Sequence, residues 1–360
     1  MIDFLVIGGG IAGVSAAARL SEVGQVVLLE GEDALAYHAS GRSAAMFEEN
    51  YGKPSTIELN RASRAFHQGA EVLGPRGLML IGGKQDADAF AHDLETMKLE
   101  EISTSDARSM IPILRTDAVD RAAHDPHAWD IDTDKLVQTF VRMARQNGAE
   151  IVPKALVTAI SRDGTGWIVQ VGGTDYTARN IVNAAGAWGD EIAKMAGIAP
   201  IGLTPLRRSM ARIPAPGGHD VSRWPMVFGA GETWYAKPDA GALIVSPADE
   251  DPVTPHDAFA DDMVLAEGLA RYEANVTEPV TRLLSSWAGL RTFTPDRTLV
   301  LGPDPAVENF IWCAGQGGYG MQSAPAASQL LADLVAGRQP ELPASTVKAL
   351  TPQRLRAHHA

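Results

Sequence analysis

The chain has 360 residues, of which 45% are hydrophobic and 21% are charged, and its formal net charge is −13. This length and composition indicate a globular protein of about two domains and exclude the disordered and fibrous classes. The negative charge argues against nucleic acid or an anionic membrane as the main partner.

A single cysteine, Cys313, rules out an internal disulfide. The first residues already suit a strand with no basic leader before it, and no apolar run reaches the ~20 residues that span a bilayer. We therefore expect no transmembrane segment and a cytoplasmic location, with peripheral docking at the inner membrane left open. We also expect a monomer or a weak dimer.

The first thirty residues predict one βαβ unit. Residues 4–7 suit a buried parallel strand, residues 11–22 are rich in Ala and Leu as in a close-packed helix, and residues 26–30 suit the next strand. Gly24 ends the helix.

The turn between the first strand and the helix carries the pattern G-x-G-x-x-G at Gly8, Gly10 and Gly13. The first glycine permits a tight turn, the second lets a pyrophosphate approach the backbone, and the third lets helix and strand pack closely. The helix N-terminus offers N–H groups to the phosphates. Gly9, the variable position, is expected to accept alanine without loss.

Glu30 follows Gly8 by 22 residues, where a carboxylate can accept the ribose hydroxyls of a dinucleotide without a 2′-phosphate. FAD and NAD remain as alternatives. Residues 38–47, HASGRSAAMF, form a small, hydroxyl-bearing loop that can run beside a pyrophosphate and under a flat ring, which favours FAD. His38 is expected to have a structural role.

The chain then alternates between two kinds of pattern. Residues 52–127 are mixed, with one polar helix near 86–101, and look like an insertion. A helix after the N-cap Asp132 ends at Gly148 and returns to a strand at 151–152. A hairpin at 167–171 leads to a buried strand over 181–188, followed by a helix over 189–196. Residues 200–290 alternate as strands do, with one helix near 261–276.

Residues 309–337 repeat the opening design of apolar strand, glycines and helix. Gly317, Gly318 and Gly320 leave backbone exposed, and the helix that begins near Met321 points its positive end at whatever lies in front of it. Such an arrangement would stabilise the negative charge of a reduced flavin. An NAD-linked enzyme would not need this second glycine turn.

Taken in order, VIGGGIAGVSAAARL, Glu30, YHASGRSAA, IVNAAGAW, WAGLR at 287–291 and QGGYGMQSAPA at 316–326 resemble the D-amino acid oxidase (DAO) superfamily of FAD-dependent oxidoreductases. The resemblance covers essentially the whole chain. It is greatest to bacterial D-arginine dehydrogenase and the broad D-amino acid dehydrogenases.

The resemblance implies non-covalent FAD and a set of residues that bind it. These are Gly8, Gly10, Ala12, Gly13, Glu30, Gly31, Ser40, Gly41, Arg42, Ser43, Ala44, Ala45, Val157, Ala185, Gly186, Trp188, Gly317, Gly320, Met321 and Gln322.

The resemblance also implies a substrate site. Arg291 would grip the substrate carboxylate, Arg208 would contact the substrate, and Tyr51 and Tyr235 would donate to the same carboxylate, with Tyr51 on a mobile lid. Gly318 would accept from the amine through its carbonyl. The implied reaction is hydride transfer from the α-carbon of a D-amino acid to flavin, giving a 2-oxo acid and ammonia.

Two positions depart from the D-arginine enzymes. Leu78 stands where they carry the glutamate that attracts the cationic side chain, and Met46 stands where they carry a histidine. Glu48 and Glu49 on the lid could supply negative charge from another direction. We expect broad specificity with a preference for apolar side chains, because a buried cation without a counter-charge is costly.

The expected fold is a doubly wound α/β FAD domain (1–50, 130–200 and 285–360) with an α+β substrate domain built on a mostly antiparallel sheet (51–129 and 201–284). Two alternatives stay open: a secondary-amine oxidase of the sarcosine or glycine oxidase type, and a flavoprotein with structural FAD. The electron acceptor, whether a quinone, a dye or oxygen, is undecided, and the histidines show no metal-ligand spacing.

Overall fold

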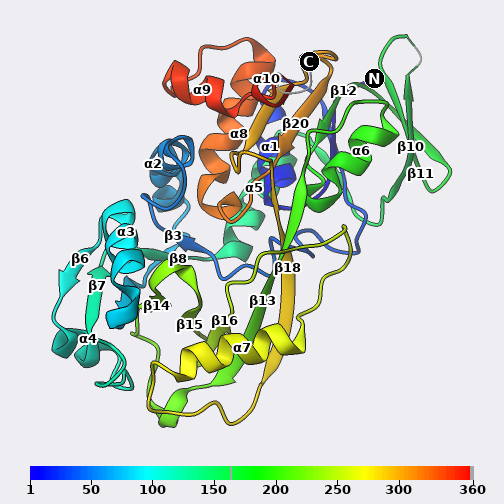
Figure 1. Cartoon of the computed structure of the whole chain (residues 1–360). Helices are drawn as coiled ribbons and strands as arrows, with labels where there is room; N and C mark the ends of the chain where they lie inside the picture. The colour runs from blue at the N-terminus through cyan, green and yellow to red at the C-terminus, as the bar shows by residue number, and fades with distance from the viewer. Residues whose placement is uncertain (163, 357–360) are drawn as a thin grey trace.

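Two large β-sheets and one small one organise the computed structural model, which describes residues 1–162 and 164–356 (Figure 1). The first sheet has eight strands in the order β10-β11-β12-β1-β2-β9, with β20 pairing with both β12 and β19. Its strands are β1 (Ile2–Ile7), β2 (Val26–Leu29), β9 (Glu150–Val152), β10 (Val157–Arg162), β11 (Trp167–Val171), β12 (Thr174–Asn183), β19 (Val300–Pro303) and β20 (Phe310–Ala314). The neighbours β9, β2, β1, β12 and β20 are parallel.

Strand β1 is buried on both faces of this sheet. Phe4 and Val6 belong to the core on one side, whereas Leu5 and Ile7 belong to the core on the other side, together with Trp167. Side chains of a strand alternate between faces, so an unbroken apolar run is what a parallel strand covered on both sides requires. The expected βαβ unit is confirmed.

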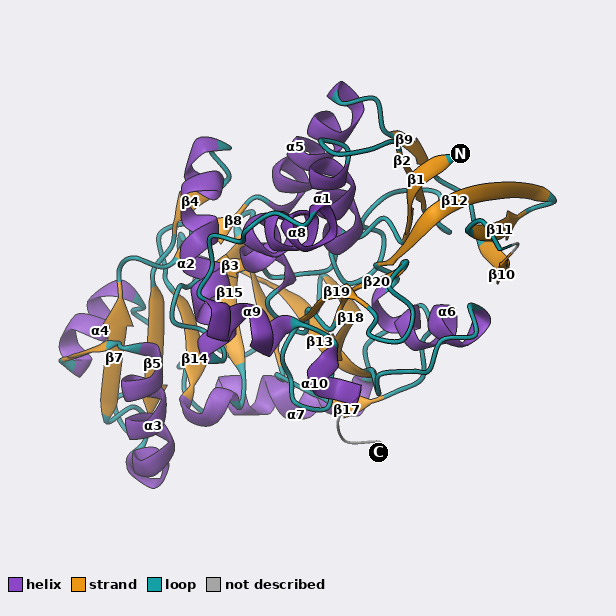
Figure 2. Ribbon diagram, turned by 90° about the horizontal axis from the view of Figure 1, so that it is seen from above, coloured by secondary structure: helices purple, strands orange, loops and turns teal. Residues whose placement is uncertain are grey.

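Helix α1 (Ile11–Leu20) packs against both α5 (Thr133–Gln146) and α8 (Gly320–Ala336) on one face (Figure 2). Asp132 caps α5 as expected, because its side chain accepts a hydrogen bond from the Lys135 N–H at 2.9 Å. The three helices hold the two glycine turns on the same side of the molecule.

The second sheet has nine strands, in the order β17-β13-β16-β15-β14-β5-β7-β6, with β18 on β13. Its strands are β5 (Leu78–Gly82), β6 (Glu100–Ile102), β7 (Arg121–Asp125), β13 (Thr204–Pro214), β14 (Met226–Gly229), β15 (Tyr235–Asp239), β16 (Ala242–Ser246), β17 (Asp251–Pro252) and β18 (Ser285–Phe293). The sheet is antiparallel, as expected, except where β5 and β14 run parallel. Strands β13 and β18 run side by side between the two halves of the molecule (Figure 1).

The remaining elements cover the sheets. The small sheet contains β3 (Met46–Phe47), β8 (Trp129–Ile131) and β4 (Leu73–Pro75). The other helices are α2 (Pro54–Gly69), α3 (Ala87–Met97), α4 (Thr104–Met110), α6 (Gly189–Met195), α7 (Asp262–Glu273), α9 (Ala344–Leu350) and α10 (Gln353–Arg356). Across the described residues, no helix has the length and apolar character needed to cross a membrane.

The structure differs from the expected elements in three places. Helix α2 forms in the stretch that was expected to be mixed, and the buried strand expected over 181–188 ends at Asn183, because residues 186–188 form a 3-10 turn. Strand β18 pairs with β13 in the second sheet, so the boundary expected at residue 285 does not coincide with a change of sheet. The division into two domains stays a proposal.

Helix α8 contains Pro325, and α2 supplies hydrogen bonds where α8 is interrupted. The Ser63 hydroxyl accepts from the Ala326 N–H at 3.1 Å and donates to the Ser323 carbonyl at 3.3 Å. The His67 Nε2 lies 2.9 Å from the Gln322 carbonyl, and burial lowers the pKa of this histidine, so the neutral ring donates through Nε2–H. A proline inside a helix removes a backbone donor, and buried backbone groups need partners.

Candidate active site

Three adjoining cavities run between the two large sheets. The glycine-turn cavity has a volume of about 380 Å³, the middle cavity about 130 Å³ and the arginine cavity about 100 Å³. Ser40 and Arg42 line both of the first two cavities, and Arg208 and Arg291 line both of the last two. The cavities therefore lie next to one another, with the middle cavity between the other two.

The first glycine turn lies in the wall of the glycine-turn cavity. Gly8 has a φ of +106°, and a Cβ atom added to it would lie 2.5 Å from the Ala184 carbonyl oxygen. A Cβ added to Gly13 would lie 1.8 Å from the Gly8 carbonyl oxygen. At Gly10, in contrast, the nearest atom would be the Ser40 Oγ at 3.2 Å, and Gly10 faces the cavities. The three glycines thus have the separate functions expected of them: a turn, close packing and an open approach.

The expectation that Gly9 accepts alanine without loss stays a prediction, and the contacts of Gly9 argue against it. Its N–H donates to the Glu30 Oε2 at 2.6 Å, and an added Cβ atom would lie 2.8 Å from that oxygen and 2.5 Å from the Leu35 Cδ2. The second Glu30 oxygen accepts from the Glu32 N–H at 2.8 Å. A methyl group at position 9 would therefore displace the carboxylate that is expected to bind the ribose.

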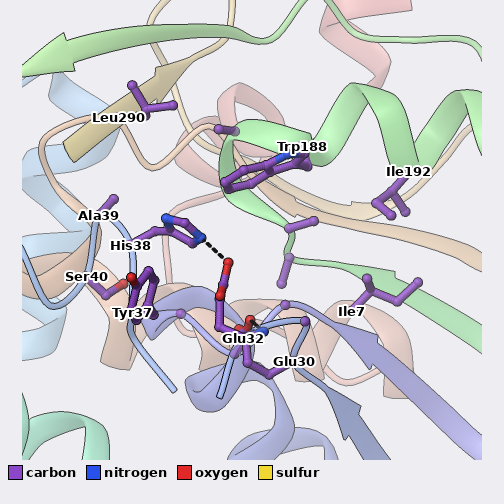
Figure 3. Close-up of a pocket in the computed structure, with 18 of the residues that line it drawn as sticks. Ile7, Glu30, Glu32, Tyr37, His38, Ala39, Ser40, Trp188, Ile192 and Leu290 are labelled. Atoms are coloured by element: carbon purple, nitrogen blue, oxygen red, sulfur yellow. Dashed lines mark hydrogen bonds and ion pairs between the residues drawn. The ribbon is translucent and has the colours of Figure 1, made fainter. Parts of the chain in front are cut away.

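Aromatic side chains form the opposite wall of the glycine-turn cavity, as the close-up shows (Figure 3). The His38 Nε2 lies 2.8 Å from the Glu32 Oε1, and its ring centroid lies 4.8 Å from that of Trp188. Ten residues expected to bind the cofactor line this cavity: Gly8, Gly10, Glu30, Gly31, Ser40, Arg42, Val157, Ala185, Gly186 and Trp188.

The Arg42 guanidinium is already engaged by the protein. Its Nη1 donates to the carbonyl oxygens of Ala258 at 2.8 Å and Ala288 at 3.1 Å, and its Nη2 lies 2.5 Å from Asp257. Arg42 therefore ties the loop that carries Ser40 to β18 and to the segment before α7.

The second glycine turn lies beside the middle cavity. Gly317 has a φ of +52°, and an added Cβ atom would lie 2.3 Å from the Phe293 ring of β18. Six residues of the expected cofactor set that do not line the glycine-turn cavity are found here: Ala12, Ser43, Ala44, Gly317, Gly320 and Met321. Two others, Ala45 and Gln322, line the arginine cavity instead.

Two residues of the expected cofactor set, Gly13 and Gly41, line none of the three cavities. The Gly41 N–H donates to the Ala36 carbonyl at 2.8 Å, and an added Cβ atom would lie 2.4 Å from that oxygen. Both glycines shape the backbone from behind the cavities.

Arg291 lies in the wall of the arginine cavity. Within residues 1–162 and 164–356, its guanidinium has no hydrogen bond and no ion pair, and it lies against Gly318, where an added Cβ atom would be 3.1 Å from the Nη1. Burial lowers the pKa of Arg291, but Tyr235, Tyr51, Glu232 and Glu250 raise it, and the net direction is upward. A cation that is free of partners remains available to an anionic ligand.

Arg208 and the two tyrosines lie nearby, and each has a partner. The Arg208 Nε donates to the Asp249 carbonyl at 2.9 Å, and its Nη2 lies 3.2 Å from the Glu250 Oε1. The Tyr51 hydroxyl donates to the Glu232 Oε2 at 3.0 Å, and the Tyr235 hydroxyl contacts the Met210 Sδ at 3.3 Å. The structure thus brings the four predicted side chains to one cavity.

Much of the remaining wall of the arginine cavity is apolar. Leu78 lines it and is 4% exposed. The other large apolar lining residues are Met46, Met97, Met226, Phe228 and Trp234. An apolar wall opposite a free guanidinium suits a small molecule with one anionic and one apolar end.

The two lid glutamates differ in their surroundings. Glu48 lines the cavity and is 5% exposed, and burial, with a contribution from Asp125, raises its pKa to about 8. It is therefore a neutral acid at pH 7. Glu49 pairs with Arg64 at 2.9 Å and lines none of the three cavities. The negative charge that these residues were expected to offer is absent from this wall at neutral pH.

Sequence reasoning missed several lining residues. Glu232 belongs to a turn whose sequence, GAGET, carries no motif, and Met226 and Phe228 reach the cavity only because β14 pairs in parallel with β5. Gly289, between the first two cavities, lies inside the segment WAGLR and could have been found there. Among the described residues, no three His, Cys, Asp or Glu side chains are grouped so as to hold a metal ion.

Comparisons with known proteins agree with this geometry. Residues 3–334 match the family model described as DAO, FAD dependent oxidoreductase. The chain is 27% identical, over 61% of its length, to the hydrogen cyanide synthase subunit HcnC of Pseudomonas aeruginosa, of which it covers 52%. It is 24% identical, over 94% of its length, to the mitochondrial dimethylglycine dehydrogenase of Rattus norvegicus, of which it covers 43%.

The chain thus spans about half the length of these two relatives. Its fold is also that of L-proline dehydrogenase from P. horikoshii, with a TM-score of 0.83, 20% identity and coverage of 99% of this chain and 98% of that one. The particular resemblance to D-arginine and D-amino acid dehydrogenases stays a prediction.

Proposed function

Because the chain belongs to the DAO family of FAD-dependent oxidoreductases, we propose that it deaminates small D-amino acids oxidatively, with a preference for apolar side chains. The reaction takes a hydride from the α-carbon and gives an imino acid, which water converts to a 2-oxo acid and ammonia. The unpaired guanidinium of Arg291, in a cavity with apolar walls, is the observation that carries this proposal.

FAD is the cofactor, and the residues present fit it. Helix α1 begins at Ile11 after the N-cap Gly10, and its first turn has no acidic residue, which suits a pyrophosphate. The Ile11 N–H donates to the Ser40 Oγ at 2.9 Å, so Ser40 also lies at this end of the helix. Glu30 lines the glycine-turn cavity and would accept from the ribose hydroxyls, and the middle cavity, bounded by two glycine loops, would take the flat ring. None of the described residues that line the middle cavity is a cysteine, histidine or tyrosine, so we propose that FAD is held without a covalent bond.

Bound FAD supplies the hydride acceptor, and the chain's own residues place the substrate. Arg291 would bind the carboxylate through paired, charge-assisted hydrogen bonds, with Tyr51 and Tyr235 as further donors. The Gly318 carbonyl would accept from the amine and so fix the α-carbon toward the middle cavity. Arg208, which already pairs with Glu250, would position this arrangement from the border between the cavities.

The apolar preference follows from the wall around Leu78. A cationic side chain that lies against Leu78 would meet alkyl and thioether groups and the neutral Glu48, and a buried charge without a counter-charge costs several kcal/mol. The charged carboxylate that also lines the cavity, Glu232, belongs to an exposed turn residue, so water weakens its attraction for such a cation. We therefore place D-methionine and D-leucine before D-arginine among the proposed substrates.

A second candidate is an N-alkylated amino acid such as sarcosine, dimethylglycine or proline. The relatives that carry dimethylglycine and proline in their names support this candidate, as does the small volume of the arginine cavity, about 100 Å³. Such a substrate would bind Arg291 through the same carboxylate and would differ from a D-amino acid only at the amine.

Anaerobic reduction of the bound flavin separates these candidates. Loss of the absorbance of oxidised flavin is followed with D-methionine, D-leucine, D-arginine, L-amino acids, sarcosine and proline, and air is then admitted to test oxygen as the acceptor against a quinone or a dye. We expect the fastest reduction with apolar D-amino acids. A D-arginine preference above tenfold, or reduction by sarcosine alone, would contradict the first proposal.

Two variants test the site itself. Arg291→Met should lower kcat/KM by at least about 100-fold, since it removes charged hydrogen bonds to the carboxylate. Arg115→Met removes an arginine whose partner is the exposed Asp117 and should leave kcat/KM unchanged. Equal rates in the two variants would show that Arg291 does not bind the substrate.

The cytoplasmic location, the peripheral docking and the monomeric or weakly dimeric state remain our proposals.

A further inference from the structure

Two of the charged side chains that line the arginine cavity, one cation and one anion, are not neutralised by a neighbouring side chain. Four ionisable acid or guanidine groups line it: Arg208, Arg291, Glu48 and Glu232. Arg208 is paired with Glu250 at 3.2 Å, and the same carboxylate also pairs with Arg297 at 2.9 Å. Burial raises the pKa of Glu48 to about 8, so this residue is mostly neutral at pH 7. One available cation, Arg291, and one anion, Glu232, remain.

The backbone places the Glu232 carboxylate at the cavity. Glu232 ends a 3-10 turn (Ala230–Glu232) between β14 and β15, and its φ is +52°. The preceding Gly231 N–H donates to Asp93 on α3 at 2.7 Å, which fixes the turn. Glu232 is an exposed residue that also lines the cavity, so its charge lies at the mouth.

Tyr51 links this carboxylate to the substrate site. The Tyr51 hydroxyl donates to the Glu232 Oε2 at 3.0 Å. Burial raises the pKa of Tyr51 and the charge of Glu232 raises it further, so the hydroxyl keeps its proton and can donate. A substrate carboxylate on Arg291 would take this donor and leave Glu232 with its charge less well solvated.

We propose that Glu232 determines specificity by rejecting ligands that carry a second negative charge. The inference rests on the proposed function in one respect, that Arg291 binds a carboxylate. The site offers one free cation, which one carboxylate satisfies. A second carboxylate, as in D-aspartate or D-glutamate, would find no cation and would face Glu232 at the entrance.

The position of Glu232 at the mouth of the cavity sets how strongly it repels a second carboxylate. Like charges several ångströms apart near a protein surface repel strongly enough to change a dissociation constant by about tenfold, and salt weakens this repulsion when the groups face water. Selectivity should therefore fall as ionic strength rises.

Binding of simple carboxylates to the holoenzyme tests the proposal without turnover. Propionate and succinate are titrated at pH 7.5 and low salt, and the shift of the visible flavin absorbance reports binding. In Glu232→Gln, the ratio of the succinate Kd to the propionate Kd should fall by about tenfold, chiefly through tighter succinate binding. The wild-type ratio should also fall as salt is added. An unchanged ratio in Glu232→Gln would overturn the proposal.

Two further variants isolate the cause. Glu49→Gln removes the same charge from the lid, at a residue that lines none of the three cavities, and should keep the wild-type ratio. Tyr51→Phe keeps the Glu232 charge and should weaken both probes by similar factors. If either variant reproduces the change seen in Glu232→Gln, long-range charge or the tyrosine hydrogen bond is responsible, and the proposal is wrong.

The outcomes also separate this inference from the proposed function. Propionate binding that is lost in Arg291→Met, together with an unchanged ratio in Glu232→Gln, contradicts the role of Glu232 alone. Propionate binding that does not depend on Arg291 contradicts the carboxylate site, and the inference falls with it.

Discussion

An added methyl group would meet different atoms at Gly9 and Gly13, although both glycines belong to the same turn. At Gly13 it would meet a backbone carbonyl, which cannot move without breaking the contact between α1 and β1. At Gly9 it would meet the ends of two side chains, Leu35 and Glu30, which can turn aside. Gly13→Ala should therefore affect folding, whereas Gly9→Ala should affect the binding of FAD.

We expect Gly13→Ala to prevent stable folding with FAD. Gly9→Ala should give a folded protein with an FAD dissociation constant raised about tenfold, because overpacking of this kind costs about 1–3 kcal/mol. Fluorescence quenching of FAD gives the constant, and Gly69→Ala is the control, since no described atom lies within 4 Å of the added carbon. Wild-type affinity in Gly9→Ala would show that Glu30 moves without cost.

Glu48 predicts a dependence of stability on pH. Its pKa of about 8 in the folded protein lies above the ordinary value of 4.5, so between these values the folded state holds a proton that the unfolded state has lost. The free energy of unfolding then falls as pH rises from about 5 to 8, by up to about 1.4 kcal/mol per pH unit from this group, and levels off above 8.

Melting of the wild type and Glu48→Gln, with FAD in excess at pH 5.5, 6.5 and 7.5, checks this prediction. The variant should gain stability relative to the wild type at each step upward in pH. A difference that stays constant across the range would show that Glu48 is ionised throughout.

The motifs of the sequence indicated the glycines, Glu30 and Arg291, because such residues stand in fixed order within segments that have a known chemistry. Glu232 carried no signal of this kind. Its position depends on a turn with positive φ and on a hydroxyl donor 181 residues away. Side chains placed by long-range contacts are not readable from local pattern.

Helix α2 is an element that the spacing of apolar residues could not predict. Of its six buried residues, only Leu59 is apolar, whereas Ser55, Thr56, Asn60, Ser63 and His67 are polar. A search for apolar residues at helical spacing cannot find such a face. The face is polar because it supplies hydrogen bonds to α8 around Pro325 and to nearby carbonyls.

Ser63→Ala should therefore lower the free energy of unfolding by about 1–3 kcal/mol, because the buried Ala326 N–H loses its acceptor. Urea unfolding measures the change, and Ser109→Ala on the exposed face of α4 is the control, with an expected effect within about 0.5 kcal/mol. Equal free energies of unfolding in the two variants would show that the Ala326 N–H does not depend on Ser63 as its acceptor.

At the scale of the whole molecule, FAD should stabilise the fold, because its cavities lie between elements of both large sheets. Removing FAD should lower the Tm, and adding it back should raise the Tm with the logarithm of its concentration. At 100 times the Kd, the gain is about 2.7 kcal/mol. Differential scanning fluorimetry of apo and reconstituted protein measures this, and an identical Tm in the two forms would contradict it.

The sequence indicated the parallel sheet and the pairing of the two glycine turns in one site, since the βαβ pattern and the repeated design are local. The order of the nine-stranded sheet was not predictable. Strand β14 pairs with β5, and β18 pairs with β13 rather than joining the first sheet, and such pairings depend on packing across the whole chain.

The distance along the chain between the two glycine turns also sets an order of events during synthesis. Gly317 leaves the ribosome 309 residues after Gly8, and at roughly 5–20 residues per second this takes about 15–60 s. During that time the first βαβ unit has neither α8 nor the middle cavity. The complete FAD site therefore cannot form before α8 has been made, and until then the face of α1 that α8 later fills stays uncovered.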